Sequence, residues 1–189
     1  MSKYQVSPMS RNEIRQYTNK IRGLIGLKSD EFVNAPKLYD TLSVLFSNHG
    51  LDFDYTVLPD NDEIFIDKEE AFTNVVTGKI YIKESVMNRA CNNSYDRGAF
   101  TLIHELGHFF LHYIQLDAKL CRVEDEIDVP AYRDPEWQAN AFASEFLMPF
   151  VACIDMTPDE IRNTFHVSKK AATIRASEIR EEIYGFVDE

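Results

Sequence analysis

The chain has 189 residues, of which 44% are hydrophobic, and its 20 Lys and Arg against 31 Asp and Glu give a formal net charge of −11. This length and composition suit one substantial globular domain, and the acidic charge opposes binding to a phosphate backbone, so we expect no direct nucleic-acid partner. The N-terminus lacks the apolar region of a signal peptide, and no segment has the roughly 18 apolar residues needed to span a bilayer. We therefore expect a cytoplasmic protein without a membrane partner.

Two amphipathic helices are predicted at the start of the chain. Ser10 and Glu13 have the spacing of a capping box, and apolar residues then recur at helical intervals up to Gly26. The second helix is predicted to begin after Asn34, a favourable N-cap, and to end at Gly50. Both helices are interpreted as packing elements.

A small sheet is predicted next, because the hydrophobic period changes from helical spacing to two. A Thr77-Gly78 break indicates that the last two strands form a hairpin. The predicted sheet is mostly antiparallel. Its strands are expected at residues 51–57, 63–66, 72–76 and 79–82.

A short helix over 84–90 and a polar loop are expected to lead into a helix that starts near Arg97 and contains the pattern H-E-x-x-H. Residues four apart share one helix face, so His104 and His108 can present two imidazoles to a single metal ion. Glu105 lies beside them, where it can reach a water on the metal without replacing a ligand. The pattern predicts a zinc hydrolase with Glu105 as its general base.

Two histidines leave a catalytic zinc site incomplete, because such sites usually have three protein ligands and an open fourth position. His112 lies on the same helix roughly 12 Å from His104, too far to complete the site, and is interpreted as a supporting or core residue. A carboxylate from a later helix is the other common solution. We choose Glu136 as the third ligand and keep Glu145, deeper in the same helix, as the second choice.

The helix that carries both carboxylates is predicted from Asp134, as its N-cap, to Pro149. The small residues Ala139, Ala141 and Ala143 would let it approach another helix closely. The acidic stretch 117–134 before it is interpreted as a solvated loop.

We divide the chain into a metallopeptidase core, residues 1–154, and a C-terminal helical extension, residues 155–189, packed on the core. Capping patterns at Thr157 and Ser168 predict two helices joined by a short turn. A DNA-reading role is not favoured, because this part has five Lys and Arg against eight Asp and Glu.

Two segments, RGAFTLIHELGHFFLH at 97–112 and YRDPEWQANAFASEFLMP at 132–149, resemble the signature blocks of the ImmA/IrrE family of metallopeptidases. The resemblance implies that His104, His108 and Glu136 bind Zn²⁺ and that Glu105 is the catalytic residue. It also implies an α+β, zincin-like fold with flanking helices, and a substrate: a helix-turn-helix (Xre-like) repressor, as in regulatory proteolysis in phages or mobile elements.

The preferred hypothesis is therefore a zinc endopeptidase that cleaves or inactivates a repressor. We expect the substrate to lie along an edge strand, with residues 79–82 as the candidate, and Tyr113, Tyr132 or His112 to stabilise the oxyanion. The alternative is a zinc-containing antirepressor that binds its partner without hydrolysis. A purely structural zinc site, with four protein ligands, is a third reading.

Overall fold

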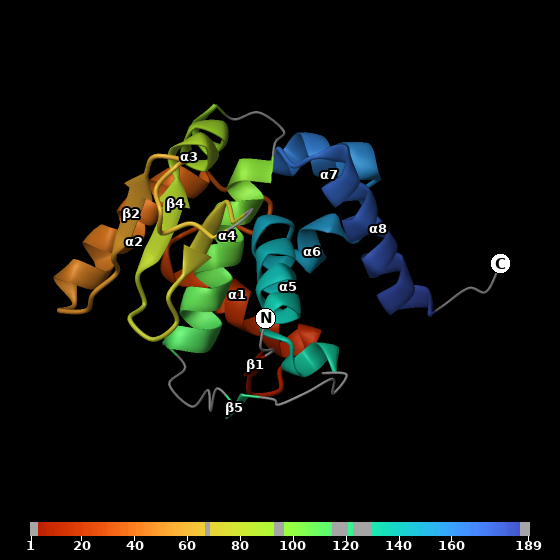
Figure 1. Cartoon of the computed structure of the whole chain (residues 1–189). Helices are drawn as coiled ribbons and strands as arrows, with labels where there is room; N and C mark the ends of the chain where they lie inside the picture. Colours follow the sequence, from red (N-terminus) through yellow and green to blue (C-terminus); the bar gives the residue numbers. More distant parts are fainter. Residues whose placement is uncertain (1–3, 67–68, 93–96, 115–120, 123–129, 186–189) are drawn as a thin grey trace.

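A computed structural model describes the chain except for residues 1–3, 67–68, 93–96, 115–120, 123–129 and 186–189 (Figure 1). It is an α+β fold in which α4 lies between a small sheet and α5, with α7 and α8 beyond α5. Among the described residues, none of the helices has the length and apolar character that a membrane span requires.

The α-helices are α1 (Arg11–Leu24), α2 (Ala35–Asn48), α3 (Glu84–Cys91), α4 (Arg97–His108), α5 (Pro135–Leu147), α6 (Phe150–Cys153), α7 (Pro158–Phe165) and α8 (Lys169–Tyr184). The strands are β1 (Tyr4–Gln5), β2 (Tyr55–Leu58), β3 (Ala71–Thr73), β4 (Ile80–Lys83) and β5 (Cys121–Arg122), and the shorter turns are η1 (Phe109–Tyr113) and η2 (Ala131–Arg133).

The helix ends agree with the predicted capping residues. Ser10 and Thr157 each form a complete capping box at the start of α1 and α7. Asp134 accepts hydrogen bonds from the first turn of α5, and Ser168 accepts one from the first turn of α8. These helices were predictable because a cap depends on residues only three apart.

The three-stranded sheet is mixed, whereas a mostly antiparallel sheet was expected. Its order is β2-β4-β3, with β2 parallel and β3 antiparallel to β4. The predicted hairpin across Thr77-Gly78 is confirmed by the β3–β4 pairing. The strand predicted at 63–66 is wrong: the segment turns, because the Asp62 side chain and carbonyl accept bonds from Ile64 and Phe65. Two further strands, β1 and β5, form a separate antiparallel pair.

The core is centred on α4, which the other elements cover on several sides. Leu102, Ile103 and Leu106 are fully buried, and the hydroxyl of Tyr39 on α2 donates to the Leu102 carbonyl at 2.7 Å. The contact between α4 and α5 is close. A Cβ added to Gly107 would lie 3.0 Å from the Cα of Ala139, so the small residue predicted on α5 meets a glycine on α4.

Candidate metal centre

The two histidines of α4 point their Nε2 atoms at one point. His104 and His108 are one helical turn apart, and their Nε2 atoms are 3.1 Å from each other. Glu136, in the first turn of α5, joins them: one carboxylate oxygen lies 3.3 Å from His104 Nε2 and the other lies 3.4 Å from His108 Nε2. We call His104, His108 and Glu136 the metal triad. The structure thus brings together the three residues predicted as ligands.

The spacing of the metal triad fits a metal ion such as zinc. Zinc bonds to nitrogen and oxygen are about 2.0–2.2 Å long, so two ligand atoms on one tetrahedral ion lie roughly 3.4 Å apart. The two Nε2 atoms are 3.1 Å apart, and they lie 3.3 and 3.4 Å from the two different oxygens of Glu136, each distance being close to this value. Two imidazole nitrogens and a carboxylate can share such a space only around a cation or a proton.

The pKa values of the metal triad also indicate that a positive charge is favoured between the two imidazoles and the carboxylate. When Nε2 of His104 and of His108 carries a proton, its hydrogen bond to Glu136 lowers the pKa of that carboxyl group far below its ordinary value. A bound metal ion would take the place of these protons. Burial opposes the charging of His104, but the hydrogen bond and charge of Glu136, with the charge of Glu105, outweigh it and raise its pKa. The carboxylate thus favours a positive charge at the point where the two imidazoles meet.

A buried chain of hydrogen bonds, from Gln138 through His112, determines which nitrogen of His108 carries the proton. The Gln138 amide nitrogen donates to the carbonyls of Ser7 and Tyr132, both at 2.8 Å, so its oxygen is the atom 3.1 Å from His112 Nε2. His112 Nε2 therefore carries a proton. Burial lowers the pKa of His112 to about 4, which keeps the ring neutral and its Nδ1 an acceptor. The His108 Nδ1, 3.1 Å away, must then be the donor, which leaves the lone pair of His108 Nε2 for a metal.

We expect Gln138→Leu to weaken metal binding by roughly 10- to 100-fold, because it removes the last hydrogen-bonding residue of the chain that fixes the His108 tautomer. Competition between the protein and a chromophoric chelator measures the affinity. Thermal unfolding of the metal-free variant is the control for damage to the fold. Unchanged affinity in a folded variant would contradict this role of the chain.

His104 is oriented by α5. Its Nδ1 lies 3.1 Å from the side-chain oxygen of Asn140, one turn after Glu136 on the same helix face. With Nδ1 as the donor, the lone pair of His104 Nε2 also faces the triad. Thus α5 carries Glu136 together with residues that orient both histidines.

Glu105 lines a hollow of about 250 Å³ that is bounded by β3, α4 and α5 and that is also lined by His104 and Glu136. We call this space the metal-site hollow. Only 5% of Glu105 is exposed, and burial raises the pKa of its carboxyl group. Thr73 on β3 holds it: the Thr73 hydroxyl is 2.7 Å from Oε2 and 3.0 Å from the Glu105 carbonyl. A carboxylate of raised proton affinity therefore stands beside the triad.

Glu145, the second choice for the third ligand, has a different place. Its fully buried carboxylate binds Arg15 and Arg175, each through two nitrogens at 2.6–3.1 Å, and Arg11 at 3.0 Å. These arginines come from α1 and α8, so the cluster joins three helices. Its outer anions are Glu178, 2.6 Å from Arg11, and Glu182, 2.6 Å from Arg15.

The predicted oxyanion residues are not gathered at the metal-site hollow. His112 is buried, with its two nitrogens directed at His108 and Gln138. Tyr113 packs on Gly78, where an added Cβ would lie 2.3 Å from the ring. Neither Tyr113 nor Tyr132 is among the described residues that line the hollow.

Sequence reasoning did not assign roles to Thr73, Gln138 and Asn140. The role of Asn140 could have been predicted, because it lies four residues after Glu136 and therefore on the same helix face. Gln138 was detectable only as a polar residue in an apolar run. Thr73 had no signal, because its contact with Glu105 spans 32 positions of the chain.

Comparison with known proteins identifies the region that contains this site. Residues 89–177 match the family model described as the IrrE N-terminal-like domain, Peptidase_M78. The matched range contains α4 and α5, and with them the metal triad and Glu105. The comparisons with curated proteins and with solved structures gave no significant match.

Proposed function

The chain belongs to the ImmA/IrrE family of metallopeptidases, and from this premise we propose that it is a zinc-dependent endopeptidase with Glu105 as its general base. The observation that carries the proposal is the meeting of His104, His108 and Glu136 at separations that fit one tetrahedral ion, with Glu105 beside them. Family membership makes the protein a metallopeptidase. The choice of zinc follows from the two imidazoles and one carboxylate of the donor set.

A zinc ion held by the metal triad would polarise the scissile carbonyl and lower the pKa of a water molecule toward about 7. Glu105 accepts the proton of the attacking water and then donates it to the amine that leaves. Because Thr73 holds Oε2, we assign the proton transfer to Oε1. The raised pKa of the buried carboxyl group favours this exchange.

The substrate is proposed to lie along β3. Residues 79–82, expected as the edge strand, form the central strand β4, which is paired on both sides. On either side of β3, the Asn74 amide donates to the Lys79 carbonyl and the Glu70 carbonyl accepts from the Lys83 amide. Because the ladder alternates, the amides of Ala71 and Thr73 point to the side away from β4. That open edge borders the metal-site hollow and can pair with an extended peptide.

We propose that the substrate is a helix-turn-helix repressor, the partner implied by the family resemblance. The alternative, an antirepressor that binds without hydrolysis, has no need of Glu105 or of the bond from Thr73 that holds it. Both features favour the peptidase.

The test is to incubate the zinc-loaded protein with the repressor encoded by the neighbouring gene and to look for fragments by mass spectrometry. We expect fragments that disappear after zinc removal by a chelator and return when zinc is restored. A stable complex without fragments would contradict hydrolysis and support the antirepressor. No complex and no fragments would contradict the choice of substrate.

A further inference from the structure

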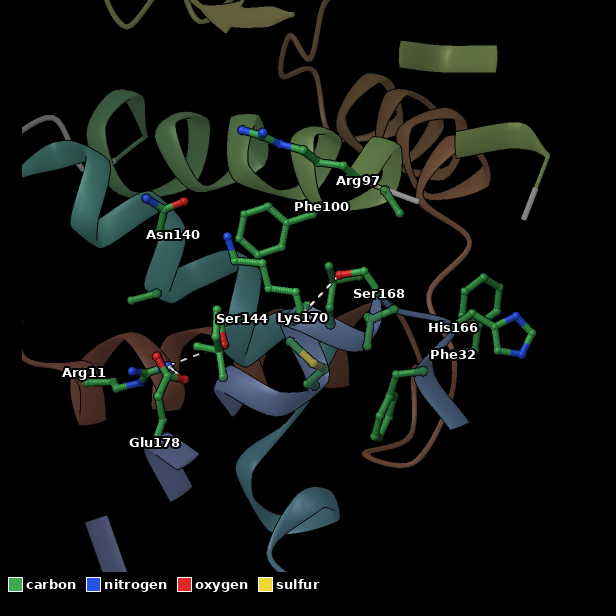
Figure 2. Close-up of a pocket in the computed structure, with 18 of the residues that line it drawn as sticks. Arg11, Phe32, Arg97, Phe100, Asn140, Ser144, His166, Ser168, Lys170 and Glu178 are labelled. Carbon is green, nitrogen blue, oxygen red and sulfur yellow. Dashed lines mark hydrogen bonds and ion pairs between the residues drawn. The ribbon is translucent and has the colours of Figure 1, made fainter. Parts of the chain in front are cut away.

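A second cavity, of about 470 Å³, lies beside the metal-site hollow (Figure 2). It is bounded by α4, α5, the turn between α7 and α8, and α8 as far as Glu178, with Arg11 of α1 and Phe32 also in its wall; we call it the side cavity. Arg97, Phe100 and Asn140 line both spaces. The two spaces therefore lie next to each other and share part of their walls on α4 and α5.

The wall of the side cavity is largely apolar. Phe100 and Trp137 are only half-buried, and Ile174 on α8 is 48% exposed although it is a large hydrophobic residue. Cavities of 300–1,000 Å³ with apolar walls and a few polar groups are typical binding sites. The apolar side chains of the wall include Phe100, Trp137, Leu147, Met148, Phe165 and Ile174.

Its charge is positive in a chain whose net charge is −11. Lys170, in the first turn of α8, and Arg97, at the start of α4, line the side cavity and are exposed. Arg11 and Glu178 also line it, but they pair with each other at 2.6 Å. The exposed ammonium group of Lys170 complements an acidic group.

The distance to the metal triad suits a peptide. Phe100 precedes His104 by one helical turn, which corresponds to about 6 Å along the helix axis. An extended chain advances about 3.3 Å per residue, so about two residues cover this distance. Successive side chains of an extended chain alternate in direction, so every second side chain of the peptide lies on the same side.

We propose that the side cavity is a specificity site of the peptidase. It receives a bulky apolar side chain of the substrate, about two residues from the scissile bond, and an Asp or Glu two residues from that side chain, on the same side of the extended chain, faces Lys170. This inference rests on the proposed function, since it places a polypeptide across the metal triad.

The chain offers its own probe, because its single tryptophan, Trp137, lines the side cavity. The zinc-loaded, full-length Glu105→Gln protein is titrated with a blocked pentapeptide that contains one Leu and one Asp, and Trp137 fluorescence is followed. We expect saturable binding. Replacing the Leu of the peptide by Ala should raise Kd by about 10-fold or more.

Two pairs of variants separate the side cavity from the nearby surface. Ala171→Phe fills the cavity and should raise Kd by about 10-fold, whereas Thr173→Phe, on the exposed face of α8, should leave it unchanged. Lys170→Glu should raise Kd about fivefold for the Asp peptide and lower it for a peptide with Lys instead. Lys169→Glu, which makes the same charge change outside the cavity, should leave Kd unchanged for both peptides.

Cleavage of the same peptides by the unmutated protein separates this inference from the proposed function. Binding that depends on Leu, Ala171 and Lys170 without cleavage would support the site and contradict hydrolysis. Cleavage at a rate that these changes do not alter would overturn the site but would still support the proposed peptidase activity. If no peptide changes Trp137 fluorescence, the site is overturned.

Discussion

The variant Glu105→Gln is expected to cut the repressor at least about 100-fold more slowly than the unmutated protein, with its zinc content unchanged. General acid–base catalysis by a positioned side chain contributes typically about 10²–10⁴-fold. Glutamine has the shape of glutamate, and its carbonyl oxygen can still accept the bond from Thr73, but it cannot take up a proton at neutral pH. The rate constants are measured by following the intact repressor over time.

Glu84→Gln is the matched control for this experiment. It removes the charge of an exposed glutamate at the start of α3, outside the metal-site hollow, and should leave the rate unchanged. Zinc analysis of both variants shows whether the metal triad is intact. A zinc-loaded Glu105→Gln protein that cuts at the original rate would exclude Glu105 as the base.

We expect Glu145→Gln to lower the free energy of unfolding by about 3–5 kcal/mol, the usual cost of removing one partner from a buried ion pair. The change leaves Arg15 and Arg175 inside the protein without the carboxylate that each binds through two nitrogens. Urea unfolding of the metal-free protein measures this loss of unfolding free energy. Glu182→Gln is the control: its side chain is 43% exposed, so the loss should stay below about 1 kcal/mol. Equal losses in the two variants would contradict the assignment.

The same cluster predicts how stability depends on pH. Burial would raise the pKa of Glu145, but hydrogen bonds and charges from Arg175 and Arg15 outweigh it and lower the pKa from 4.5 to about 2. The folded protein therefore holds this proton less tightly than the unfolded chain. The stabilisation is complete above about pH 4.5 and is lost as the pH falls toward 2. Glu145→Gln should remove this part of the acid dependence, as measured by urea unfolding between pH 5 and pH 2.

The parts of the fold that depend on near neighbours were predictable from the sequence. Capping boxes at Ser10 and Thr157 and the i, i+4 pair His104 and His108 involve residues three or four apart, so their geometry follows from the helix alone. Glu136 was a choice between two carboxylates on one helix. The structure separates them, because Glu136 faces α4 while Glu145 faces α1 and α8.

The parts that depend on distant pairing were not predictable. The strand order β2-β4-β3 is set by the way β3 folds back on the far side of β4, and a pattern of alternating residues is the same in a central and an edge strand. The Thr73 contact with Glu105 and the side cavity between α4, α5 and α8 follow from that arrangement and from helix packing. Neither leaves a local signal in the sequence.

The contact between Gly107 and Ala139 has a consequence for how this site can vary among related chains. His104 and His108 are on α4 and Glu136 is on α5, and this contact limits how closely the two helices approach each other. A larger residue at either contact position would therefore move Glu136 away from the histidines. We expect natural variation in side-chain size to be narrow at these two positions.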